Sequence, residues 1–315
     1  MEKTIKCAQR ITNFSSIGIT DRFDKSKFNP ETFLSTLQAN SPKLFELLKN
    51  IQSLDRKDYN THGKLFKHYI YSSASNGYGS KVIASAFVSS GYILVNKKLK
   101  SKIVVDQDIV YSKSDSKFAL LSSTALWNTQ TTPTTTKQTL KIFNDRPSNI
   151  HGEKIRFIIL DSGFKEGVDL YDVKYCHIFE DQLNDSDLIQ AQGRALRFRG
   201  QCGLEFNRGW ILEVFNYKSV FFPVSNKSVS LIKYLQDQDL KLKFRLNLIK
   251  QLDILIKDSS IDNNLFKNIN KYQDPSFFKR IIIPSATIGS LAGAGIIAFG
   301  VINSLRNKQI KLIKN

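Results

Sequence analysis

The sequence predicts an α/β domain over residues 28–225, built on one parallel sheet with helices on both faces. Two observations predict it: short apolar runs rich in β-branched and aromatic residues, and helical patterns that lie between them. Alternating strands and helices favour a parallel sheet, because parallel neighbours need a crossover that a helix usually supplies. The predicted strands cover residues 68–73, 103–110, 118–122, 155–161, 174–179 and 210–216.

Helical patterns separate several of these strands, and a threonine-rich stretch interrupts them. Residues 124–136 contain seven threonines and one proline, a composition that predicts a loop. Before the domain we expect an N-terminal leader (1–27), and after it a mainly helical basic linker (226–280). The predicted helices cover residues 41–53, 79–90, 137–144 and 186–197.

The composition indicates a packed, strongly basic protein. Its 315 residues are 41% hydrophobic and 11% aromatic, which is enough apolar surface to exclude intrinsic disorder as the main state. Forty-six Lys and Arg against 28 Asp and Glu give a formal net charge of +18. Such an excess favours a polyanionic partner, either nucleic acid or an anionic membrane, although a general bias toward surface lysine is the alternative.

Cysteine and histidine suggest no disulfide framework and no metal site. The three cysteines are widely spaced and form no CxxC pair, so we expect a reducing compartment. The four histidines are scattered, and those at positions 68 and 177 fall on predicted strands, which favours roles in the core. We therefore expect no metal ligands.

The segment from Ile281 to Leu305 departs from the rest of the composition, because its 25 residues carry no charge. As a helix it would be roughly 37 Å long, against about 30 Å for a hydrocarbon core. We expect a single-pass C-terminal anchor in a host or virion lipid membrane, with a basic tail (306–315) and a cytosolic large domain; a buried core helix is the alternative. Gly289 and Gly293 form a GxxxG spacing, which would allow a homodimer.

The densest chemical signal is the run QAQGRALR, which begins at Gln190 and matches the pattern QxxGRxxR. On the predicted helix, Arg194 and Arg197 lie three residues apart and share a face. Two guanidinium groups so placed suit phosphate oxygens. Gly193 would let the helix approach a neighbour or ligand, and Gln190 would hydrogen-bond on the same face. A solvated basic helix is the alternative.

A second motif lies upstream, in the run IRFIILDSGFKEGVDL over residues 155–170. It predicts a strand that enters a turn, followed by another strand and the arginine helix. In order and spacing these elements resemble motifs V and VI of superfamily 2 helicases. The run FKHYIYSS, followed by NGYGSKVIA, resembles motif IV. The resemblance covers about residues 41–216. In the amino acids of its motifs, the sequence most resembles helicase-like proteins of nucleocytoplasmic large DNA viruses.

This resemblance implies a helicase C-terminal domain, a single RecA-like lobe, and a role for each motif residue. Arg194 and Arg197 would be the catalytic residues that face the γ-phosphate of ATP, with Arg197 in the arginine-finger position. The implied nucleotide-binding residues are Gly167, Asp169, Gln190 and Gly193, and the implied nucleic-acid-binding residues are Ser72, Ser162 and Gly163.

The first lobe of a helicase supplies a GxxxxGK[ST] loop and a carboxylate pair for Mg²⁺. The sequence contains neither, and with about 40 residues ahead of the resembling region we do not expect a first lobe of typical domain size. An arginine finger acts only opposite a phosphate site. We therefore expect no ATPase activity from this chain alone, and ATP with Mg²⁺ only where a partner ATPase lobe is present.

Three functions follow from these observations. The leading hypothesis is a membrane-anchored helicase C-terminal-like protein that binds nucleic acid, RNA or DNA, or lends its arginines to a partner ATPase. The second is a catalytically inert membrane or virion structural protein derived from a helicase lobe. The third is one half of a split helicase whose first lobe is encoded separately.

Overall fold

The computed structural model places most of the first 238 residues, and these belong largely to one of two compact units. The described part of the first unit ends at Ile232, and the described residues of the second lie between Lys233 and Ile254. The described residues are 2–15, 22–74, 77–164, 167–182, 185–205, 211–221, 229–238, 244, 247–248, 251–252 and 254.

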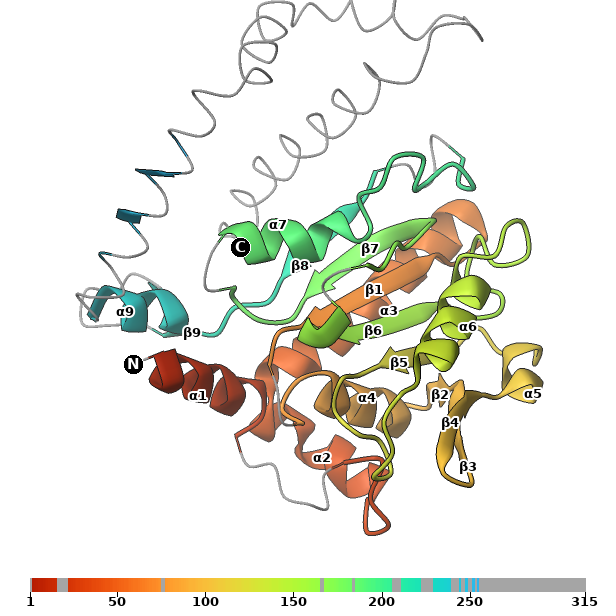
Figure 1. The fold of residues 1–315 in the computed structure, drawn as a ribbon, viewed down its shortest axis with the longest axis horizontal. Helices are drawn as coiled ribbons and strands as arrows, with labels where there is room; N and C mark the ends of the chain where they lie inside the picture. The colour runs from red at the N-terminus through yellow and green to blue at the C-terminus, as the bar shows by residue number, and fades with distance from the viewer. Residues whose placement is uncertain are drawn as a thin grey trace, which may run out of the picture. The chain divides into compact units, whose positions relative to one another are not determined.

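A six-stranded parallel sheet forms the centre of the first unit (Figure 1). Its strand order is β2-β5-β6-β1-β7-β8, and every neighbouring pair runs parallel. The predicted parallel sheet is therefore confirmed. The strands are β1 (Lys67–Ser72), β2 (Ile93–Leu94), β5 (Lys117–Leu121), β6 (Phe157–Asp161), β7 (Val173–Ile178) and β8 (Glu213–Asn216).

Helices cover both faces of this sheet, as predicted. Alternate residues of each strand face opposite sides, so Ile70 and Ile159 pack with α2, α3 and α4, whereas Tyr69 and Ile158 pack with α6 and α7. These four strand residues are fully buried. The helices are α1 (Glu2–Asn13), α2 (Pro30–Asn40), α3 (Pro42–His62), α4 (Ser80–Ser89), α5 (Gln107–Val110), α6 (Pro133–Phe143), α7 (Asp185–Gly193) and α9 (Leu231–Gln238).

The predicted strand 103–110 is wrong in its second half. The chain forms β4 (Lys102–Val105) and then turns into α5, because Asp106 caps that helix by accepting from the Asp108 amide. β4 pairs antiparallel with β3 (Asn96–Leu99), and these two strands form a small sheet of their own. A third sheet joins β9 (Val220–Phe221) to β10 (Val229–Ser230).

Two helices are longer than the sequence pattern predicts. α3 continues to His62, nine residues past its predicted end at 53, because the polar stretch beyond still contains buried side chains such as Leu54 and Asp58. α6 begins at Pro133, inside the predicted threonine loop, because the Thr132 hydroxyl caps it by accepting from the Thr135 amide.

The predicted membrane segment, Ile281 to Leu305, lies outside the described residues, as do the basic tail and most of the linker. Among the residues that are described, no helix is both long and apolar enough to cross a membrane.

Two histidines lie side by side inside the sheet. His68 on β1 and His177 on β7 stack, with ring centroids 5.3 Å apart, and their Nδ1 and Nε2 atoms are 3.0 Å apart. His68 Nε2 lies 3.3 Å from Asp55 Oδ1, and His177 Nδ1 lies 2.9 Å from the Tyr217 hydroxyl. Burial lowers the pKa of both histidines, and that of His177 well below its usual value, although Asp55 opposes the effect at His68.

This pair predicts that the protein loses stability as the pH falls. Unfolded histidines bind protons near pH 6.5, whereas His68 and His177 in the folded protein resist protonation, so unfolding takes up protons below that pH. Between about pH 7.5 and about pH 5.5 we expect the free energy of unfolding to fall by about 1 kcal/mol for each histidine. Urea denaturation at the two pH values measures this.

His177→Gln should reduce the size of this loss, whereas His62→Gln, outside the pair, should leave it unchanged. An equal free energy of unfolding at the two pH values would contradict the interpretation.

Candidate functional site

The strands of the sheet end together in a row of polar residues. Because the strands are parallel, the carboxyl ends of β1, β5 and β6 meet at one edge, and ligands of open α/β sheets bind at such an edge. Ser72 ends β1, Ser122 follows β5, and Asp161 ends β6. We call this the carboxyl edge.

Asp161 organises one half of the carboxyl edge. Its Oδ2 accepts from the Ser122 hydroxyl at 3.0 Å and from the Ser123 amide at 2.7 Å, and its Oδ1 accepts from the Gly163 amide at 3.0 Å. A Cβ atom at Gly163 would lie 2.5 Å from Ser123 Cβ, so the turn requires glycine there. Ser162 is half-buried and Gly163 is exposed, so both predicted nucleic-acid-binding residues of this turn can be reached from solvent.

Glu180 organises the other half. This buried carboxylate follows β7 and accepts from the Ser72 hydroxyl at 2.5 Å, the Ser73 amide at 2.8 Å and Asn13 Nδ2 at 2.6 Å. Burial lowers the pKa of the neighbouring Lys43 to about 8, although the charge of Glu180 opposes the shift. Ser72 is itself fully buried. The structure therefore places this predicted nucleic-acid-binding residue beneath the surface, in contact with an internal carboxylate.

The arginines of QxxGRxxR do not share a helical face, and that expectation is wrong. α7 ends at Gly193, and the chain continues as turns and coil. The reason is a tertiary contact: the Leu170 amide donates to the Arg194 carbonyl at 3.0 Å, which draws the chain out of the helix. Gly193 has open space around its Cβ position, so the helix does not approach a neighbouring protein segment closely there. Gln190 on α7 is exposed.

The structure nevertheless brings a predicted phosphate-facing arginine to a predicted nucleotide-binding residue. Arg197 Nε lies 2.7 Å from Asp169 Oδ1, and both side chains are partly exposed, at 38% and 53%. Gly167, with a φ of 72°, begins the exposed turn that leads to Asp169. Arg194 lies beneath this turn, 8% exposed, and its Nη1 reaches the Val168 carbonyl at 3.5 Å.

Arg194 Nε is buried and has no hydrogen-bond partner in the described part of the chain. A buried donor without an acceptor costs about 1–3 kcal/mol. The site therefore contains a guanidinium group with unused hydrogen-bonding capacity, and a second guanidinium group that is held by a carboxylate of the same turn.

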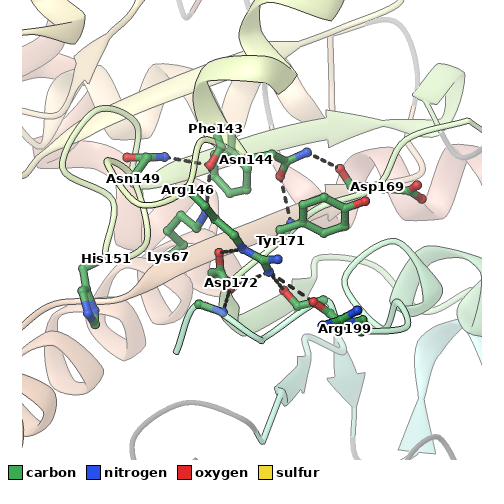
Figure 2. Close-up of polar contacts among 12 residues, drawn as sticks. Lys67, Phe143, Asn144, Arg146, Asn149, His151, Asp169, Tyr171, Asp172 and Arg199 are labelled. Atoms are coloured by element: carbon green, nitrogen blue, oxygen red, sulfur yellow. Dashed lines mark hydrogen bonds and ion pairs between the residues drawn. The ribbon is translucent and has the colours of Figure 1, made fainter. Parts of the chain in front are cut away.

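A buried ion pair holds the Asp169 turn and the loop of Arg197 in place (Figure 2). Arg146 Nε and Nη2 bind Asp172 Oδ2 and Oδ1 at 2.7 and 2.8 Å, and the Asp172 side chain is fully buried. Arg146 Nη2 also donates to the Gly200 carbonyl at 2.8 Å, and Asp172 Oδ1 accepts from the Gly203 amide at 2.9 Å. One fork therefore joins the loop after α6, the start of β7 and the loop after α7.

Asn144 adds a second link to the same turn (Figure 2). Its Nδ2 donates to the Asp169 carbonyl at 2.8 Å, and its Oδ1 accepts from the Tyr171 amide at 2.9 Å. The backbone beside the Asp169–Arg197 pair is thus fixed from both sides. Sequence reasoning missed Asn144, Arg146 and Asp172, because no motif connects residues so far apart.

None of the described residues, in this site or outside it, form a group of three or more His, Cys, Asp or Glu side chains that could hold a metal ion.

Proteins similar to this chain are helicases by name. A protein of Acanthamoeba polyphaga mimivirus, named as a proposed ATP-dependent RNA helicase, is 29% identical over 133 residues, which are 41% of this chain and 16% of that protein. A second mimivirus protein with the same kind of name is 29% identical over 148 residues, 47% and 24% of the two chains. A helicase of killer plasmid pGKL-2 from Kluyveromyces lactis, named as uncharacterized, is 26% identical over 196 residues, which are 61% of this chain and 31% of that protein.

These relatives confirm the resemblance to helicases: the chain contains a domain that is similar to part of each of them. The chain spans less than a third of the length of each of the three relatives. No protein family model matches it. Among solved structures, the C-terminal part of the Fun30 ATPase domain matches 51% of this chain and 38% of its own length at 15% identity; its TM-score of 0.33 supports no argument.

The fork between Arg146 and Asp172 predicts a large effect on stability. Arg146→Ala leaves a buried carboxylate with the Gly203 amide as its remaining partner. We expect a loss of about 2–3 kcal/mol in the free energy of unfolding, below the full value for a buried pair because Arg146 is partly exposed. Arg146→Lys keeps the charge but loses the fork, so its loss should be intermediate.

Urea denaturation measures these losses. Lys141→Ala, at an exposed position on α6, serves as the control and should change the free energy of unfolding by less than about 0.5 kcal/mol. Equal stabilities of Arg146→Ala and Lys141→Ala would show that the fork is dispensable.

Proposed function

We propose that this domain is the second lobe of a helicase-type ATPase, and that it acts on ATP bound by a first lobe. The observation that carries this proposal is the position of the two arginines. Arg197 lies at the surface beside Asp169, and Arg194 lies just beneath with a donor that no described residue accepts from. Together they offer two permanent positive charges and several N–H donors on one patch.

A nucleoside triphosphate fits the surface at Arg194 and Arg197 chemically. Guanidinium groups bind phosphate oxygens through paired N–H donors, and a γ-phosphate that reaches past the covering turn would supply the acceptor that Arg194 Nε lacks. The carboxylate of Asp169 pairs with Arg197 until that anion arrives. Since the 315 residues contain no GxxxxGK[ST] loop, the phosphate must be presented by a lobe outside this sequence.

We further propose that nucleic acid binds at the carboxyl edge. α4 begins there, and its cap residue Gly79 provides no side-chain hydrogen bond, so the first amides of this ten-residue helix have no side-chain cap. Helix N-termini attract phosphate. The exposed Gly163 turn lies at the same edge of the sheet. Glu180 and Asp161 engage the hydroxyls of Ser72 and Ser122, so backbone amides are the better candidates for phosphate contacts.

Binding to single-stranded RNA and DNA tests the second part of this proposal. We expect the affinity to fall about 10- to 100-fold between about 50 and 200 mM salt, because each phosphate contact releases a counterion. Ser162→Glu places a negative charge on the Gly163 turn and should weaken binding about tenfold. Filter binding at the two salt concentrations measures both effects.

The matched control is Ser35→Glu, which adds the same charge at an exposed position on α2. It should bind like the unchanged protein. If the unchanged protein shows no salt-dependent binding to either nucleic acid, this part of the proposal fails.

ATP hydrolysis tests the role of the arginines. The purified chain alone should release phosphate no faster than a buffer control, whereas adding the first lobe of a mimivirus relative in trans should produce hydrolysis. Arg197→Ala should then lower the rate by about 1,000-fold, the usual contribution of an arginine finger. Arg199→Gln, an exposed neighbour whose side chain has no role in the proposed site, is the control and should retain the rate.

A stimulated rate that Arg197→Ala leaves unchanged would contradict this assignment and favour a structural role for the domain.

A further inference from the structure

A basic hairpin extends from the sheet beside the carboxyl edge. It consists of β3, β4 and the turn between them, residues 96–105, and can be followed in Figure 1 below β2. This stretch contains four lysines and no acidic residue: Lys97, Lys98, Lys100 and Lys102. We call it the basic hairpin.

The two faces of the basic hairpin differ. In an antiparallel pair, opposite residues share a face, so Leu99 and Lys102 lie on one side together with Lys97. The other side is anchored in the domain, where Asn96 and Ile103 are almost fully buried. Leu99 is 56% exposed, and Lys100 forms the turn with a φ of 53°. The outer face is therefore an exposed leucine among lysines.

The basic hairpin has a rigid base. Asn96 Oδ1 accepts from the Leu120 amide at 3.0 Å, which ties β3 to β5. The Thr135 hydroxyl donates to the Ile103 carbonyl at 2.6 Å, which ties β4 to α6. Anchoring from two elements means that the outer face is presented in a fixed position, so a ligand need not order it.

Much of its positive charge is uncompensated. Lys97 pairs with Asp106 at 2.7 Å, and Lys98 donates to the neutral Trp127 carbonyl at 3.1 Å. Lys100 and Lys102 are exposed, and neither makes an ion pair within the described part of the chain. Two adjacent free ammonium groups beside an exposed apolar side chain suit a ligand that offers both anions and apolar faces.

The position of the basic hairpin points to the same ligand as the carboxyl edge. β2 ends at Leu94 and the chain enters β3 two residues later, so the hairpin follows the carboxyl end of that strand. The Lys98–Trp127 contact joins it to the loop that follows Ser122 and Ser123 of the carboxyl edge. A strand bound at the carboxyl edge can continue along this loop to the hairpin.

We propose that the basic hairpin is a second contact for single-stranded nucleic acid, reached by a strand that is already bound at the carboxyl edge. Lys100 and Lys102 bind its phosphates, and Leu99 packs against a base. This inference rests on the proposed function, because it takes the strand at the carboxyl edge as given. A nucleic acid fits better than a membrane, because Leu99 is the one apolar residue on the exposed part of the hairpin, residues 97–102.

The test compares a long and a short fluorescent oligonucleotide, about 20 and about 6 nucleotides, by anisotropy. The variant Lys100→Gln with Lys102→Gln should bind the long one about tenfold more weakly, and the slope of its affinity against salt should fall by about 1.4, or about 0.7 per lysine. Its binding of the short one should be unchanged. Leu99→Ser should weaken binding of the long one with no change in slope.

The control is Lys57→Gln with Lys64→Gln, which removes the same charge from exposed positions near the amino end of β1. It should bind both oligonucleotides like the unchanged protein. All variants should unfold at the same midpoint temperature as the unchanged protein. If the hairpin variant and this control bind the long oligonucleotide equally, the inference is wrong and the proposed function stands.

Two further outcomes are distinguishable. If the unchanged protein binds neither oligonucleotide, the proposed function fails and the inference with it. If the hairpin variant loses binding to phosphatidylserine vesicles but not to the long oligonucleotide, the hairpin faces a membrane and the inference is overturned.

Discussion

The candidate site depends on one buried carboxylate, that of Asp172. It lies at the start of β7 with a φ of 58°, and it is satisfied by the two-pronged fork of Arg146 and by the Gly203 amide. Arg146 in turn reaches the carbonyls that follow α7. If the carboxylate lost these partners, the Asp169 turn and the loop of Arg197 would no longer share a fixed frame, and two residues 28 positions apart could not stay in contact.

Internal carboxylates play the same part at the carboxyl edge. Asp161 and Glu180 each hold a hydroxyl and at least one amide at the end of a strand. This arrangement stabilises the edge, because donors at strand ends have no ladder partners. It also lowers the positive potential there, so the proposed phosphate contacts would rely on backbone amides and on lysines outside the edge.

The sequence predicted the sheet well, whereas it pointed to some residues of the candidate site and missed others. β1, β5, β6 and β7 are short runs rich in aromatic and branched aliphatic residues, so their strand character is local. β3 reads as polar NKKL, and its strand pairing with β4 comes from the chain reversal, which no periodicity shows. α7 ends early because the Arg194 carbonyl accepts from Leu170, a contact from another segment. Asp169 and Arg197 belong to recognisable motifs. Their contact, however, depends on Asp172, which belongs to no motif in the sequence.

The two arginines differ in burial, and this difference gives them different roles in the proposed site. Arg197 is partly exposed and paired, so its charge is largely screened, and in the proposed site it would exchange Asp169 for a phosphate at little cost. Arg194 is buried with an unsatisfied donor, so its environment is incomplete until an acceptor arrives. A ligand that satisfies Arg194 therefore gains more than one that meets Arg197 alone. This difference favours an anion with several oxygens, such as a terminal phosphate, over a single carboxylate.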